Sequence, residues 1–171
     1  MEEELTNLLK VNLEEAWRIS DNLDNACQKV AEDFFNDLKD VYEKRGFNCT
    51  HNINLAANFT SFNIWKDGWK NISISIMVHS VGKNMVYGFL LKNSVENKFP
   101  EKLINQLRLL PNNTESGSVN WPWHRTLERP YGNWYELEAW QTILNGKMKE
   151  VVVEKIDGLL SLTKEIDFSV D

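Results

Sequence analysis

The sequence predicts an α+β fold: an antiparallel sheet of about four to five strands, arranged as a meander, packed by helices from both ends of the chain. Apolar residues recur at helical spacing in residues 1–46, alternate with polar residues in 47–92, and return to helical spacing in 134–166. The chain of 171 residues, 42% hydrophobic and 26% charged, is typical of one globular domain. We therefore expect a single domain over residues 1–171.

The N-terminal residues 1–46 are predicted to be helical, with one buried apolar stripe. The first part of the stripe consists of Leu5, Leu8, Leu9, Leu13, Ala16 and Trp17. Asn12 and Glu15 have capping-box spacing, which allows two short helices there. We expect Asp21-Asn22 to interrupt the helix, and a longer helix to run from Leu23 to Arg45. Gly46 suits the left-handed position that follows a helix.

Residues 47–92 have the period of two that is typical of strands. The first strand places Cys49, His51, Ile53 and Leu55 on one face. Three further strands are predicted at Phe59–Trp65, Ile72–Val78 and Met85–Leu91, with turns at residues 66–68 and around Gly82. Because polar residues occupy the alternate positions, we expect one face of the sheet to be exposed to water.

The rest of the chain adds helices and one irregular strand. Residues 99–110 are predicted to form a helix that begins at Pro100, ends before Pro111 and lies across the sheet. Residues 119–126 are predicted to be extended, as an edge strand, because Pro122 cannot donate to a ladder. Residues 134–166 are predicted to form the C-terminal helices, opened by a capping box of Asn133 and Glu136.

Charge and cysteine usage limit the functional classes. The net charge of −6, from 19 basic and 25 acidic residues, repels nucleic acid. Cys27 and Cys49 have no CxxC spacing and are interpreted as reduced thiols. The first residues lack the pattern of a signal peptide, and no stretch approaches the ~20 apolar residues of a membrane span. We expect a soluble cytoplasmic protein that has no membrane partner.

No arrangement of catalytic residues, metal ligands or cofactor-binding residues is recognised. The histidines His51, His79 and His124 lack the spacing of metal ligands, and nucleophile elbows and phosphate-binding glycine loops are missing. Glu96-Asn97-Lys98 matches the E-x-K of metal-dependent nucleases, with Asp67 as the upstream acid. Its polar surroundings favour a solvated loop. We therefore predict no catalytic residue, no metal and no cofactor, and an enzyme is the less favoured reading.

The strongest local signal is a concentration of tryptophan. Trp121, Trp123, Trp134 and Trp140 lie within 20 residues of one another, beside His124, Arg125, Arg129 and Tyr131. Such a mixture is typical of binding surfaces, but buried tryptophans also close small cores. We favour the interpretation that these tryptophans belong to the core, because Trp140 lies on a helical apolar stripe. The segment is therefore expected to be a fixed part of the fold. The candidate partner-binding residues are Trp121, Trp123, His124, Arg125, Arg129 and Tyr131.

The order of aromatic and glycine residues resembles a known family. The features are Tyr42 with Gly46-Phe47, Trp69 with the alternating Ile72, Ile74 and Ile76, Tyr87-Gly88-Phe89, Trp121-Pro122-Trp123 and Asn133-Trp134. From about Tyr42 to Ile166 the chain resembles the C-terminal accessory region of bacterial and phage proteins of the PD-(D/E)XK nuclease superfamily. The catalytic domain of that group has no counterpart here. The resemblance implies a recognition domain standing alone, encoded by a phage or a defence locus.

Two functions remain open at the level of sequence. The first is a non-enzymatic protein-interaction or recognition module that acts on a partner protein, with residues 2–45 as a partner-specific part. The second is a nucleic-acid-binding or nuclease-like protein, in which Arg125, Arg129, Lys147 and Lys149 contact phosphate and the tryptophans stack on bases. The acidic total makes the second function the weaker one.

Overall fold

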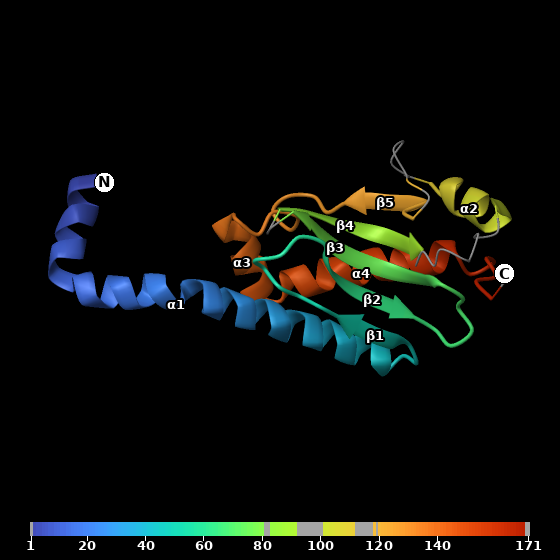
Figure 1. Cartoon of the computed structure of the whole chain (residues 1–171), viewed down its shortest axis with the longest axis horizontal. Coiled ribbons are helices and arrows are strands. Elements are labelled where there is room, and N and C mark those ends of the chain that lie inside the picture. Colours follow the sequence, from blue (N-terminus) through green and yellow to red (C-terminus); the bar gives the residue numbers. More distant parts are fainter. Residues whose placement is uncertain (1, 81–82, 92–100, 112–117, 119, 170–171) are drawn as a thin grey trace.

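The structure, a computed structural model, describes residues 2–80, 83–91, 101–111, 118 and 120–169 and confirms the α+β class. Its elements follow the order shown in Figure 1. They are α1 Glu2–Glu43, β1 Asn48–His51, β2 Thr60–Trp65, β3 Ile72–Ser80, β4 Lys83–Leu91, α2 Glu101–Arg108, β5 Trp123–Thr126, α3 Leu137–Leu144 and α4 Lys147–Leu162.

The five strands form one antiparallel meander, as the alternating pattern predicts. The strand order is β1-β2-β3-β4-β5, so β5 is an edge strand. Ile74 in β3 lies opposite Ile64 in β2 and Phe89 in β4. At the β4–β5 pair, Gly88 lies opposite His124, and a Cβ atom built on Gly88 would be 2.2 Å from the carbonyl oxygen of Trp123. Only glycine therefore permits this close approach of the two backbones.

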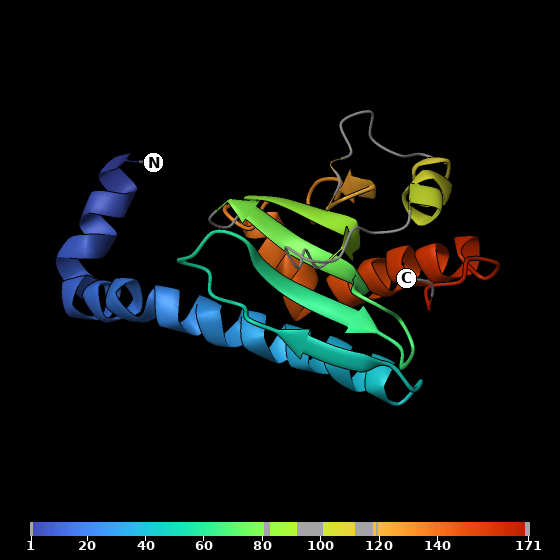
Figure 2. The ribbon, with the colours of Figure 1, turned by 45° about the vertical axis from the view of Figure 1, so that its right-hand side comes forward.

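The hydrophobic core lies between one face of the sheet and two helices. The C-terminal half of α1 and the length of α4 run along this face in both views (Figures 1 and 2). Phe35 of α1 packs 5.7 Å from Phe62 of β2, measured between ring centroids, and Ile156 of α4 belongs to the same buried cluster. Gly46, in the turn that follows α1, has the left-handed backbone predicted for it, with φ 80°. The Phe47 amide then donates to the Tyr42 carbonyl at 3.1 Å.

The second face of the sheet is less exposed than the alternation predicts. Ser61, Ser73 and Ser75 are buried, although they occupy the polar positions of β2 and β3. Their hydroxyl groups are linked through one another and through Asn63, whose side chain donates to Ser61 and accepts from Ser75. Buried hydroxyl groups of this kind are tolerated because they are hydrogen-bonded.

The N-terminal helix differs from the prediction in two ways. It passes through Asp21-Asn22 without a break, and the Asn22 side-chain nitrogen Nδ2 donates to the Arg18 carbonyl at 2.7 Å. Its irregular point is Asn12, with φ −127° and ψ 29°, which is where the capping-box spacing allowed two helices. The expected buried stripe is wrong for its first part, because Leu5 and Leu13 are exposed.

Other predicted boundaries also shift. The first strand ends at His51, and the Gln28 side chain then accepts from the Leu55 amide and donates to the Ile53 carbonyl. Helix α2 lies beyond the N-terminal end of β5 and not across the sheet (Figures 1 and 2).

The C-terminal helices also begin and end inside their predicted range. The predicted capping box does not cap α3, since Asn133 donates to the Glu136 carboxylate and the helix begins at Leu137. Helix α4 ends at Leu162 and not near residue 166.

Candidate functional site

The tryptophan-rich segment is divided between core and surface. Trp123 is 3% exposed, its ring lies 5.8 Å from that of Tyr87, and its indole nitrogen donates to the Pro111 carbonyl at 3.0 Å. Trp134 is buried too, and its carbonyl accepts from the Trp140 indole at 2.7 Å. These rings fix the backbone around β5 and α3 through packing.

The other predicted partner-binding residues lie nearer the surface. Trp121 and His124 are half-buried and face each other edge-on, with their ring centroids 6.1 Å apart. Arg125 and Arg129 are exposed, and the Arg129 guanidinium lies 3.2 Å from the Glu136 carboxylate. Tyr131 is half-buried. Trp123 therefore supports the segment from inside, while the remaining five predicted residues are at least partly accessible.

A more extended surface lies on the first part of α1, residues 2–26, which we call the α1 arm. Figures 1 and 2 show that it leaves the sheet and projects away from the rest of the molecule. The Gln28 side chain binds the backbone at Ile53 and Leu55. Among the helix residues whose burial is described, Ala31 is the first that is buried. The arm is therefore a projecting helix on which the described apolar side chains Leu5, Leu13, Ile19 and Leu23 are exposed.

The α1 arm carries an apolar seam. Of the ten large apolar side chains that are exposed in the described parts of the chain, four lie on the arm: Leu5, Leu13, Ile19 and Leu23. Ile19 is 59% and Leu23 is 53% exposed, and together with Ala16 and Ala26 they follow three- and four-residue spacing along one face. This spacing is the pattern by which a helix packs against another helix or in an apolar groove.

The arm also holds almost all of the net charge of the chain. Residues 2–26 contain seven acidic and two basic residues, a net charge of −5, whereas the whole chain has −6. The rest of the molecule is therefore close to neutral. An acidic helix with an apolar seam is electrostatically complementary to a basic partner.

A pocket of about 580 Å³, which we call the α4 pocket, lies at the other end of α1. Its walls come from the segment after α1, the turn between β2 and β3, and the C-terminal end of α4 with the residues that follow. Phe47, Trp69 and Phe168 supply aromatic surface, and the Trp69 and Phe168 ring centroids are 4.6 Å apart. The Lys70 amide donates to the Phe168 carbonyl at 2.9 Å, which ties the C-terminal segment to the turn.

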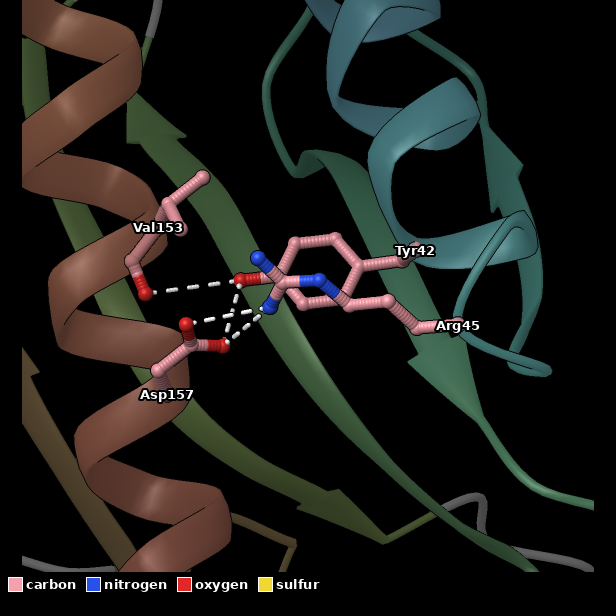
Figure 3. Close-up of polar contacts among 4 residues, drawn as sticks. All are labelled: Tyr42, Arg45, Val153 and Asp157. Carbon is pink, nitrogen blue, oxygen red and sulfur yellow. Dashed lines mark hydrogen bonds and ion pairs between the residues drawn. The ribbon is translucent and has the colours of Figure 1, made fainter.

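One edge of the α4 pocket is an ordered polar cluster (Figure 3). Nη1 of Arg45 lies 2.8 Å and 3.0 Å from the two carboxylate oxygens of Asp157. The Tyr42 hydroxyl lies 3.3 Å from Asp157 and 3.4 Å from the Val153 carbonyl. Burial raises the pKa of Tyr42 far above its ordinary value, so this hydroxyl keeps its proton and acts as a donor.

The remaining residues considered in the sequence do not form a site. Within the described ranges, no three His, Cys, Asp or Glu side chains are placed to hold a metal ion. Asp67 is exposed, and its carboxylate accepts from the Asn48 side-chain nitrogen Nδ2 at 2.7 Å. Glu96-Asn97-Lys98 lies outside the described residues. The thiols of Cys27 and Cys49 are free. None of the helices in the described part of the chain combines the length and apolar content needed to cross a bilayer.

Searches against protein-family models, curated proteins and solved structures found no match to this chain. The resemblance to the accessory region of PD-(D/E)XK nucleases therefore stays a prediction. Sequence reasoning missed the α4 pocket because its residues come from three distant segments, 45–47, 66–69 and 157–168. The net charge of the α1 arm could be obtained from the sequence, but the exposure of the arm could not.

Proposed function

We propose that this protein is a non-enzymatic protein-interaction module and that the α1 arm is its binding element. The main observation in support is the projecting helix itself, on which Leu5, Leu13, Ile19 and Leu23 are exposed. Most helix stability in proteins comes from packing of an apolar face, and the exposed leucine and isoleucine side chains of the arm receive no such packing. A partner that covers the seam supplies that packing and buries its apolar side chains.

The partner we propose is a protein whose apolar groove is bordered by Lys and Arg. The net charge of −5 on the arm attracts such a rim and accelerates association. A second copy of the same chain fits less well, because pairing two arms places −5 against −5. The resemblance to the accessory region of PD-(D/E)XK nucleases implies a more specific partner, namely a nuclease or another defence protein.

The test compares two double variants of the full-length protein. Ile19→Gln/Leu23→Gln removes apolar surface from the arm, and Leu109→Gln/Leu144→Gln removes the same kind of exposed side chain from the body. A protein captured from the native host is identified, purified and titrated against all three forms. We expect the arm variant to bind at least about tenfold more weakly, the body variant to bind like the parent, and the parent's affinity to fall with added salt.

Two results would overturn this assignment. Equal affinity of the arm variant and the parent for the partner would show that the arm is not part of the interface. Loss of binding in Trp121→Ala or Arg129→Ala, with no effect of the arm variant, moves the interface to the tryptophan-rich segment. Light scattering of the parent tests the second-copy alternative, for which dimers that strengthen with added salt would be the signature.

Nucleic-acid binding is the second candidate, and the surface charges favour it less. Three of its four proposed phosphate contacts already have acidic neighbours. Arg129 pairs with Glu136, Lys147 lies 2.9 Å from Glu150, and Lys149 lies 3.1 Å from Asp37. A gel-shift assay with single- and double-stranded DNA at low salt, with and without Mg²⁺, separates binding, cleavage and neither.

A further inference from the structure

The α4 pocket has a net positive charge within an acidic protein. Its lining includes Arg45, Lys66 and Lys164, against the single carboxylate of Asp157. Both oxygens of that carboxylate lie within hydrogen-bonding distance of Arg45. Lys66 and Lys164 have no acidic partner in the described part of the chain. Two positive charges are thus available at the rim, where a hydrated Lys ammonium can pair with an anion.

The aromatic walls of the pocket are exposed to the same space. Phe47 and Phe168 are largely buried and Trp69 is half-buried, yet all three line the pocket. The Lys66 ammonium lies 4.7 Å from the centroid of the Phe47 ring, so charge and aromatic surface meet at one point. Flat apolar groups pack well against offset aromatic rings.

The cluster in Figure 3 holds the pocket edge in place and leaves some hydrogen-bond donors of Arg45 unused. Asp157 is bound by Nη1 of Arg45 and by the Tyr42 hydroxyl, which join α4 to the end of α1. Nε and Nη2 of Arg45 make no hydrogen bond within the described residues. The guanidinium therefore retains donors for a further acceptor, such as an anionic group in the pocket.

We propose that the α4 pocket binds a small anionic ligand with a flat, apolar ring. The ring packs against Trp69 and Phe168, and the anionic group lies near Lys66, Lys164 and the remaining donors of Arg45. The volume of about 580 Å³ is within the range of small-molecule sites, roughly 300–1,000 Å³. Carboxylate and phosphate head groups share the required chemistry.

The probes are a matched pair of dyes, 1-anilinonaphthalene-8-sulfonate and its uncharged analogue N-phenyl-1-naphthylamine, titrated by fluorescence into the full-length protein. Lys66→Gln/Lys164→Gln removes the rim charge, and Lys102→Gln/Lys147→Gln makes the same change of net charge elsewhere. We expect the first variant to bind the sulfonate about fivefold more weakly and to bind the neutral dye as the parent does. The control variant is expected to match the parent with both dyes.

Further variants locate the probe. Ser161 is exposed and lines the pocket, so Ser161→Trp is expected to fill it and abolish binding of both dyes without unfolding the protein. The arm variant Ile19→Gln/Leu23→Gln is expected to bind the sulfonate normally, and its failure to do so would place the probe on the arm. Displacement by benzoate or by phenyl phosphate identifies the preferred head group. Displacement by neither, or equal sulfonate binding in the rim and control variants, would overturn the proposal.

Discussion

Replacement of Trp123 by alanine is expected to destabilise the protein strongly. The side chain is 3% exposed, lies 5.8 Å and 6.4 Å from the rings of Tyr87 and Phe89, and donates to the Pro111 carbonyl. A buried tryptophan removes ~150–250 Å² from water, which corresponds to ~4–6 kcal/mol. Truncations of this kind cost ~3–5 kcal/mol in measured cores. We expect a loss of about 4 kcal/mol in the free energy of unfolding.

Trp121→Ala is the matched control. The two tryptophans are separated by Pro122 alone, but Trp121 is half-buried, and the ring contact found for it is with His124 at 6.1 Å. Its truncation is expected to cost about 1 kcal/mol. In a domain of 171 residues each kcal/mol lowers the melting temperature by ~2–4 °C. Trp123→Ala should therefore melt about 8–16 °C below the parent, and Trp121→Ala within about 4 °C of it.

The assay is thermal unfolding followed by circular dichroism, with urea titration to obtain the free energy at 25 °C. The slope of the urea titration should be similar in all three proteins if each unfolds in one step. Equal melting temperatures for the two variants would refute the assignment of Trp123 to the core and Trp121 to the surface. A larger loss in Trp121→Ala would show that the orientation of the whole segment is reversed.

Two further predictions concern backbone and thiol chemistry. Gly88→Ala is expected to lower the free energy of unfolding by about 3 kcal/mol, because the new Cβ would lie 2.2 Å from the Trp123 carbonyl oxygen. Gly158→Ala in α4 is the control: its Cβ meets no atom within 4 Å, so the free energy of unfolding should rise by about 0.5–1 kcal/mol. Urea titration measures both. Burial raises the pKa of Cys49 to about 11, so at pH 8 about one thiol in a thousand is ionised. Mass spectrometry should find that iodoacetamide labels the half-buried Cys27 first.

Each of these has a clear contradicting outcome. A Gly88→Ala protein as stable as the parent would mean that the β4–β5 pair accommodates a side chain at this position. Labelling of Cys49 at the rate of Cys27 in the folded protein would contradict the burial of the β1 thiol. Cys27→Ser is the control for the labelling experiment, because it should remove the fast phase and leave Cys49 unlabelled until the protein is denatured.

The sheet was predictable because its signal is local. Ile72, Ile74 and Ile76 alternate with serine, which fixes both the strand and the face that enters the core. Gly46 was predictable for a similar reason, since a helix followed by Arg-Gly-Phe has few alternatives to a left-handed residue. The burial of Trp123 was harder to predict. Trp121 and Trp123 lie on either side of Pro122, and the sequence does not show which of the two rings faces the core.

The α1 arm was misread because periodicity shows that a helix has an apolar face but not what covers that face. Leu5 and Leu13 are eight residues apart and Phe34 and Leu38 are four apart, and both spacings are typical of one helical face. Phe34 and Leu38 are nevertheless buried, whereas Leu5 and Leu13 are exposed. A break was expected at Asp21-Asn22, but the helix continues through both residues. Asp and Asn each lower helix stability by no more than ~0.7 kcal/mol, which is too little to end a helix by itself. The α4 pocket has no local signal, since three distant segments form it.

The two proposed sites lie at opposite ends of one helix and are expected to act independently. Ile19 and Arg45 are 26 residues apart, which corresponds to about 40 Å along a helix. The charge on the arm is screened over ~8 Å at physiological ionic strength, so it has little influence on the potential at the pocket. Arm variants should therefore change partner binding and leave dye binding unchanged, while pocket variants should do the reverse. A partner that altered dye affinity would have to act by changing the packing between the end of α1 and α4, where Arg45 and Tyr42 meet Asp157.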